Sequence, residues 1–111
     1  MSAESCVSFF GLRFEIEGVN EIEEMEERSH RLFIESKKSG LRCYWANFAE
    51  PGEKYYAFLG KQIGIMGVEN LLEVSLGVDE LKAIIDDVTQ KLSELGYEET
   101  PKLLLQWLPD A

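Results

Sequence analysis

The sequence has few of the residues that carry catalytic, redox and metal chemistry. Its 111 residues include one histidine, two cysteines and three prolines. No Cys-x-x-Cys spacing occurs, and two cysteines are too few for the disulfide framework of a small secreted domain. We therefore expect Cys6 and Cys43 to be free thiols, and we expect neither a metal nor a cofactor.

Long apolar runs are missing as well. No stretch approaches the roughly 18 consecutive apolar residues that cross a bilayer. The first residues, Met1 to Glu4, lack the basic segment of a secretory signal. These absences favour a cytoplasmic protein that does not bind a membrane.

Nucleotide-binding and catalytic motifs are absent too. Gly60-Lys61 lacks the earlier glycine and the following Ser or Thr of a phosphate loop. His30 stands three residues after Glu27, a spacing that places two metal ligands on one helix face. A di-iron site would need the same pattern on a second helix, and the chain has no other histidine. These gaps point away from an enzyme.

Charge is abundant and strongly acidic. The net charge of −10 opposes binding to DNA or RNA, because the phosphates would repel it. Residues 1–27 hold eight acids and one base, residues 28–67 hold seven bases and three acids, and residues 68–111 hold ten acids and three bases. The middle of the chain is therefore the only cationic stretch, and folding is expected to set it against the acidic ends.

The first 40 residues predict a strand followed by a helix. A period-two pattern over residues 6–17 places bulky apolar residues on one side, which is typical of a strand that lies on a core. Asn20 and Glu23 are spaced as a capping pair at the start of a helix. Gly40 is placed to end it. We predict one continuous helix between these signals.

A hairpin follows the helix. Residues 41–48 and 54–65 read as two strands joined by a type II turn at Pro51-Gly52. Glycines at positions 60, 64 and 67 predict a bulge or bend near the end of the second of these strands.

A second helix and a last strand complete the chain. Residues 78–95 carry apolar side chains at helical spacing, and residues 102–108 form an apolar run between two prolines. Residues 72–76 could add a short extra strand. The stripe that we expect to be the largest part of the core consists of Leu81, Ile84, Ile85, Val88, Leu92 and Leu95.

The element order is β-α-β-β-α-β over residues 1–111, which predicts a single α+β domain. Its most economical form is a mainly antiparallel sheet of four strands, or five with residues 72–76, that carries both helices on one face. This is the ferredoxin-like arrangement, in which the first strand pairs with the third and the fourth.

Two groups of side chains are candidates for binding. If helices cover one face of the sheet, aromatic rings on the other face are free to contact a ligand or another protein. The acidic face of the first helix could dock on a basic partner. The candidate binding residues are Tyr44, Trp45, Phe48, Tyr55, Tyr56, Glu23, Glu26, Glu27 and His30.

These observations favour a small acidic protein-interaction or regulatory domain. Its partner would be another protein or a second copy of the chain, joined through the open sheet face or through an edge strand. The alternative is a small-molecule site, catalytic or not, between sheet and helices or inside a dimer. Its residues would come from Arg13, His30, Trp45, Asn47 and Tyr55.

Overall fold

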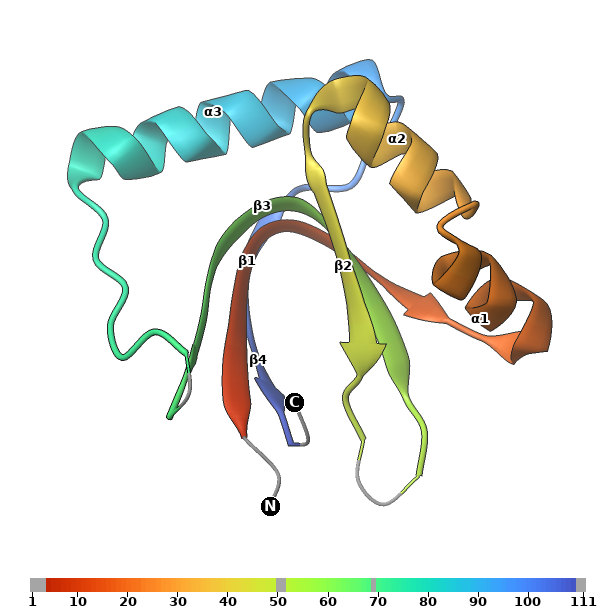
Figure 1. Ribbon diagram of the computed structural model, residues 1–111. Coiled ribbons are helices and arrows are strands. Elements are labelled where there is room, and N and C mark those ends of the chain that lie inside the picture. Colours follow the sequence, from red (N-terminus) through yellow and green to blue (C-terminus); the bar gives the residue numbers. More distant parts are fainter. Residues whose placement is uncertain (1–3, 50–51, 69, 110–111) are drawn as a thin grey trace.

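Four strands form one antiparallel sheet in the computed structural model, which describes residues 4–49, 52–68 and 70–109 (Figure 1). The strand order is β2-β3-β1-β4, so that β1 is paired with β3 and β4 as predicted. The strands are β1 (Ser5–Ile16), β2 (Arg42–Asn47), β3 (Tyr55–Gly67) and β4 (Lys102–Leu108). The predicted α+β class is confirmed, and the predicted hairpin forms from β2 and β3. Its Pro51 lies outside the described residues.

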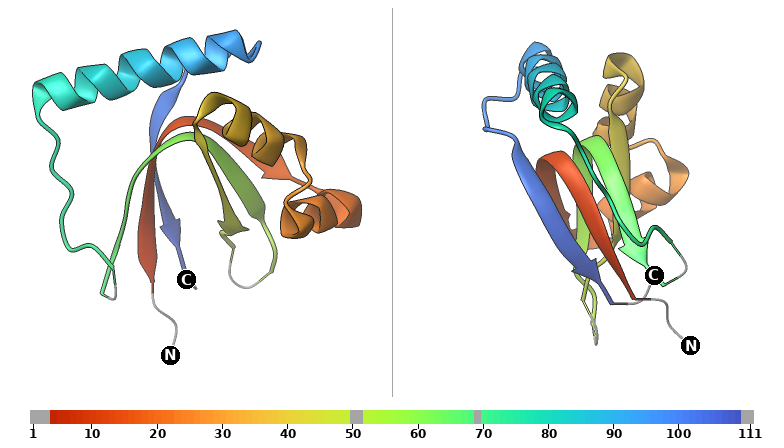
Figure 2. Two further views of the ribbon diagram at one scale, coloured as in Figure 1. Left: turned by 45° about the horizontal axis from the view of Figure 1, so that its top comes forward. Right: turned by 90° about the vertical axis from the view of Figure 1, so that its left-hand side faces the viewer.

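All helices lie on one side of the sheet, here called the outer side (Figures 1 and 2). They are α1 (Gly18–Glu27), α2 (Arg31–Ser39) and α3 (Val78–Glu94). The opposite, inner side carries no helix within the described residues. No helix in this part of the chain combines the length and apolarity needed to cross a membrane.

The single helix predicted after the first strand is two helices. Arg28 adopts the left-handed conformation, with a φ of 60°, and ends α1, while His30 is the N-cap of α2. The predicted capping pair of Asn20 and Glu23 is wrong, because the helix starts earlier. Its first turn is held by the Glu21 carboxylate, which accepts a hydrogen bond from the Glu17 backbone N–H at 3.0 Å.

The sheet bends sharply where two glycines meet. Gly11 of β1 is paired with Gly60 of β3. A Cβ on Gly11 would lie 2.1 Å from the Leu59 carbonyl oxygen, and one on Gly60 would lie 2.2 Å from that of Phe10. Only glycine allows this approach of the two backbones. The predicted irregularity of the third strand is confirmed here and again beside Phe9, where the register of β1 and β3 shifts.

Because of the bend, side chains on the inner side of the sheet pack against one another. Phe9 and Phe58 lie on either side of the glycine pair, and their ring centroids are 5.4 Å apart. Both are fully buried. The inner cluster contains Val7, Phe9, Phe58 and Leu108, with Tyr44, Ala46, Phe48, Tyr56, Ile65 and Leu104 packed around them. The open face is thus partly closed by the chain itself, and Phe9 does not reach a partner.

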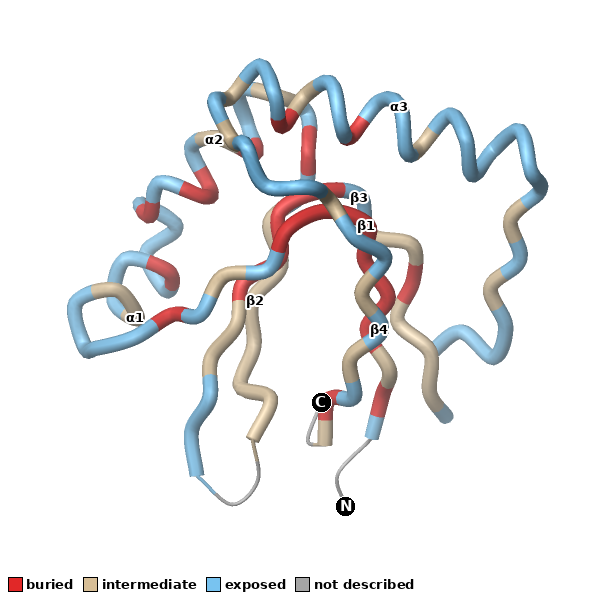
Figure 3. Tube along the Cα trace, turned by 180° about the vertical axis from the view of Figure 1, so that it is seen from behind, coloured by how far each residue is buried: buried red, intermediate tan, exposed pale blue. Residues whose placement is uncertain are grey.

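A second cluster fills the space between the sheet and the helices. The even-numbered residues from Phe10 to Ile16 in β1 point into it, as the alternation predicts. The buried positions of the chain appear in red in Figure 3. The outer cluster contains Phe10, Leu12, Ile16, Met25, Leu32, Phe33, Leu41, Ala57, Leu59, Val88 and Leu92.

The long helix α3 contributes less to this cluster than its stripe predicts. Only Val88 and Leu92 are buried, whereas Leu81 and Ile85 are 37% and 38% exposed. The C-terminal half of α3 packs on β1 and β3, and the N-terminal half extends past the bent strands (Figure 1). The extra strand considered for residues 72–76 does not form. In its place, a single parallel bridge joins Met66 to Leu71.

Candidate functional site

The sheet has two free edges of different chemical character. Strands β2 and β4 are the outermost strands, and each leaves one side of its backbone without a partner strand in the described chain. Free edges are places where another chain can add a strand. The β4 edge is apolar and the β2 edge is cationic.

Exposed apolar side chains occur on β4 and on the uncovered half of α3. Leu103, Leu105 and Trp107 are 54%, 66% and 55% exposed. Trp107 is paired with Cys6, and Leu105 with Ser8. Directly paired residues lie on the same face of a sheet, and even-numbered residues of β1 lie on the outer face, so the three side chains are on the outer side. We call the exposed apolar residues of these two elements the β4–α3 surface: Leu103, Leu105, Trp107, Val78, Leu81 and Ile85.

Little charge interrupts this surface along the strand. Lys102, at the start of β4, is the only charged residue among residues 102–108. Edge strands that stay solvated are normally protected by several charges, a proline or a bulge. Here Pro101 and Pro109 bound the strand but do not interrupt it, so its central residues present an unprotected apolar edge.

The cationic edge is a groove of about 490 Å³ between α2 and β2. Consecutive residues 42–45 line it, so positions from both faces of β2 border the groove. We call it the β2-edge groove. Its lining residues are Arg28, Phe33, Ser36, Gly40, Leu41, Arg42, Cys43, Tyr44 and Trp45. A neighbouring depression shares Arg42 with it and adds Lys61 and Lys91.

Among the residues that the structure describes, the lining of the β2-edge groove contains two guanidinium groups and no carboxylate. This is unusual for a chain with 21 acidic residues. The Arg28 guanidinium lies 4.5 Å from the centre of the Phe33 ring, a cation–π arrangement that leaves its N–H groups available. Within the described residues, neither Arg28 nor Arg42 forms an ion pair. The groove therefore offers positive charge without an internal partner.

Two polar side chains of the groove are uncharged at neutral pH. Burial raises the pKa of the Cys43 thiol to about 12, and the nearby Arg28 only partly opposes this. Burial also raises the pKa of the Tyr44 hydroxyl. Cys43 is thus a protonated thiol and a poor nucleophile. Cys6 and Cys43 are both free, on strands separated by β3.

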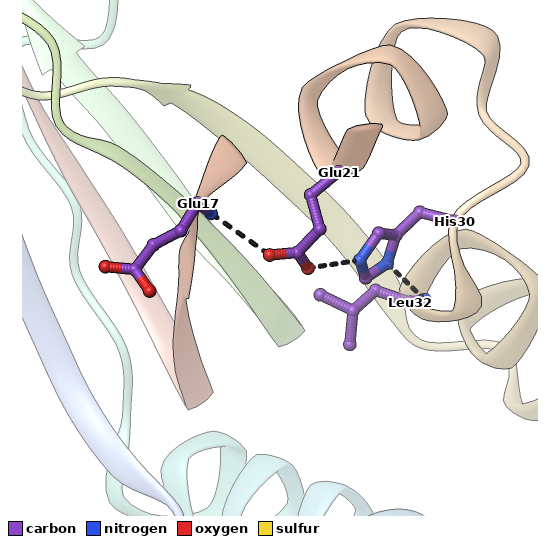
Figure 4. A network of polar contacts seen from close by, with 4 residues as sticks. All are labelled: Glu17, Glu21, His30 and Leu32. Carbon is purple, nitrogen blue, oxygen red and sulfur yellow. Dashed lines mark hydrogen bonds and ion pairs between the residues drawn. The ribbon is translucent and has the colours of Figure 1, made fainter. Parts of the chain in front are cut away.

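His30 lies elsewhere and links the first two helices (Figure 4). Its Nδ1 accepts a hydrogen bond from the Leu32 backbone N–H at 3.1 Å, which requires the proton to be on Nε2. That Nε2 donates to the Glu21 carboxylate at 2.8 Å. His30 is 7% exposed, so it is a buried cap rather than a residue on the helix surface.

Hydrogen bonds to Glu21 stabilise the charged form of its carboxylate. The backbone hydrogen bond from Glu17, followed by the one from His30, holds the pKa of the Glu21 carboxyl below its usual value. Glu27, which shares a potential metal-ligand spacing with His30, is not part of the network. No group of three candidate metal ligands occurs among residues 4–49, 52–68 and 70–109.

The aromatic candidates divide between the two sides of the sheet. Trp45 packs against Tyr55 on the outer side, with ring centroids 5.7 Å apart. On the inner side, Phe48 packs against Tyr56 at 6.0 Å, and Tyr44 is half-buried beside them. Of these five rings, Tyr44 and Trp45 line the β2-edge groove.

The acidic candidates do not meet the aromatic ones. Glu23, Glu26 and Glu27 are exposed on α1 and line none of the grooves described above. Within the described residues, the carboxylates of this helix form no ion pair with Arg28 or Arg31.

The residues considered for a small-molecule site also remain apart. Arg13 lies on the inner side and donates to the Gln106 side chain at 2.6 Å, while its guanidinium lies over the Tyr56 ring. The Asn47 side chain bonds to the hairpin loop and accepts from the Lys54 backbone N–H at 2.9 Å. Of the five, Trp45 alone lines the β2-edge groove.

Sequence reasoning missed the arginines of the groove and the apolar row of β4. The signal for the row was present, because residues 103, 105 and 107 are large and apolar and so are their neighbours at 104 and 108. A strand that is apolar on both faces must be covered on both, or be exposed on one. For Arg28 and Arg42 the local sequence gives no such signal, since they meet only through the fold.

Comparisons with known proteins identify no relatives: no protein-family model matches the chain, and neither a curated protein nor a solved structure shows significant similarity to it.

Proposed function

We propose that this protein is a non-enzymatic protein-interaction domain that works as a homodimer joined through the β4–α3 surface. The observation that carries the proposal is the row of Leu103, Leu105 and Trp107, each more than half exposed on a free edge strand. Exposed apolar patches of this kind normally mark an interaction site.

The size of the surface suits a second copy of the chain. An exposed aliphatic side chain offers roughly 60–120 Å² of apolar area, and a tryptophan about 200 Å². At roughly half exposure, the six side chains offer about 350 Å² on each copy, or about 700 Å² in a pair. Because homodimer interfaces are about 65% apolar, the total would be about 1,100 Å². That exceeds the roughly 1,000 Å² expected of a specific interface.

Strand pairing supplies the geometry. Two β4 strands that pair antiparallel about a twofold axis present the same surface to each other, as most dimer interfaces do. Their free backbone groups would become hydrogen-bonded, and the two apolar rows would lie side by side on the outer side. Since Lys102 is the only charge on β4, little like-charge repulsion opposes the pairing locally.

The fold is consistent with this arrangement. The position of β1 between β3 and β4, with helices on one side, supports a ferredoxin-like arrangement in which β4 is an edge strand available for pairing.

Sedimentation velocity over a range of protein concentrations tests the proposal. We expect wild-type protein to dimerise reversibly, and Leu105→Lys to weaken the dimer at least tenfold, because it places a charge in the middle of the row. Ile34→Lys is the matched control, since Ile34 is 59% exposed on α2 and outside the surface.

A wild-type protein that remains monomeric at millimolar concentration would overturn the proposal. So would equal effects of Leu105→Lys and Ile34→Lys on self-association. Circular dichroism of both variants verifies that they are folded.

A further inference from the structure

The β2-edge groove combines an unpaired strand edge with a cationic lining. One side of the β2 backbone is paired with β3, and the other has no partner strand in the described chain. The four consecutive residues 42–45 line the groove, so positions from both faces of β2 border it. Any extended chain placed in it would meet backbone donors and acceptors as well as side chains.

The charge of the groove selects an anionic occupant. Arg28 lines it from the end of α1 and Arg42 from the start of β2, and no carboxylate of the described chain lines it. Lys61 and Lys91 line the adjoining depression, although Lys91 is already paired with Asp87. The remainder of the protein is strongly acidic, so an anion would be repelled from most other surfaces.

The apolar residues of the groove favour a peptide over a small anion. Phe33, Leu41 and Trp45 line it together with the arginines. An extended chain presents its side chains alternately to opposite sides, so it can place carboxylates near guanidiniums and apolar groups against the rings. The six residues of β2 span about 20 Å, a length that a peptide strand matches and a small anion does not.

We propose that the β2-edge groove binds an extended, glutamate- or aspartate-rich peptide segment, which pairs with β2 as an additional strand of the sheet. The backbone of β2 would supply the affinity that is independent of sequence. Arg28 and Arg42 would select carboxylates. This site is separate from the proposed dimer surface, which lies at the opposite edge of the sheet, and does not depend on it.

Titration followed by NMR of the protein's backbone amides tests the proposal. The probe is a blocked peptide of about seven residues, long enough to span β2, in which glutamates are interspersed with valines. We expect saturable shifts confined to residues 41–48 and to the other residues that line the groove, Arg28, Phe33, Ser36 and Gly40. Two altered peptides, one with glutamines for glutamates and one with N-methylated backbone amides, should each bind at least fivefold more weakly.

Protein variants identify the side chains that recognise the peptide. Arg28→Gln and Arg42→Gln should each weaken binding about three- to tenfold, because each removes a charge-assisted hydrogen bond at a partly solvated site. Lys82→Gln is the control, since it removes one positive charge from an exposed position on α3, and should change the affinity less than about twofold.

Several outcomes would overturn the proposal. They are no binding at millimolar peptide, equal binding of the glutamine peptide, or shifts that map to β4 in place of β2. Equal binding of the N-methylated peptide, or of glutarate as a small dianion, would show that charge alone is recognised and that no strand is added.

Discussion

Gly11 and Gly60 face each other across β1 and β3, and each lacks the side-chain carbon that would strike the backbone of the other strand. Two residues from this pair on either strand, Phe9 and Phe58 meet on the inner side. Glycine weakens a strand unless a close approach requires it. Because Gly11 and Gly60 have no side chains, the two strands can approach and bend at this position. The bend in turn lets the inner cluster around Phe9 and Phe58 form.

Replacing Gly60 by alanine should therefore destabilise the protein by about 3 kcal/mol or more, since the new Cβ meets a backbone carbonyl rather than a movable side chain. Gly77→Ala is the control. Gly77 has a φ of −69°, and a Cβ there would approach nothing closer than 3.5 Å. That control should cost less than about 1 kcal/mol. Urea unfolding of both variants measures the difference, and similar costs would contradict the role given to the glycine pair.

The cap at His30 predicts a difference between two substitutions. His30→Ala removes the acceptor of the Leu32 N–H and should cost about 1–2 kcal/mol of unfolding free energy. His30→Asn should cost less, because asparagine is among the best N-cap residues. Thermal and urea unfolding compare the two variants. If asparagine proves as harmful as alanine, the imidazole does not act as a helix cap.

The lowered pKa of Glu21 predicts how stability changes in acid. The folded-state pKa lies below the ordinary value of 4.5, so the unfolded chain binds the proton first. The contribution of this carboxylate is therefore complete above about pH 4.5 and is lost as the pH falls through the folded-state pKa. Urea unfolding of wild type and Glu21→Gln between neutral and acidic pH should show a difference that shrinks in this window. A difference independent of pH would contradict the prediction.

Salt should affect the two proposed interactions in opposite directions. Added salt screens the repulsion between two copies that each carry a charge of −10, so self-association should strengthen. Screening also weakens the attraction between arginines and glutamates, so binding of the acidic peptide should weaken. Sedimentation and peptide titration at about 0.05 M and 0.5 M sodium chloride measure both effects. Weaker self-association at high salt would show that charge pairs, not apolar contacts, join the copies.

Elements with strong local boundaries were predictable almost to the residue. Strand β4 spans Lys102–Leu108 as expected, because prolines on both sides prevent its extension. Helix α3 ends at Glu94, close to the predicted residue 95, because Gly96 follows with a φ of 97°. The element order then yielded the pairing of β1 with β3 and β4.

The features that were not predictable depend on tertiary structure. The break between α1 and α2 rests on Arg28 in a left-handed conformation and on the contact of His30 with Glu21, which is nine residues away. The uncovered half of α3 could not be foreseen from its stripe, because exposure there depends on how far the strands bend away beneath it.

At the edge of β2, one feature follows from the local sequence and another depends on the tertiary structure. Trp45 and Tyr44 are adjacent in β2 and therefore lie on opposite faces of the sheet, which is a local property of any strand. Nothing in the local sequence brings Arg28 beside the edge of β2, because the two meet only after α2 folds back along the sheet.

The inner and outer clusters share no side chain, since they lie on opposite sides of the same four strands. Only backbone separates Phe58 from its neighbours Ala57 and Leu59, which point the other way. Sequence changes at sites of the two clusters that lie more than about 10 Å apart should therefore have independent energetic effects. Natural variation could remodel one side of this molecule while leaving the opposite side intact.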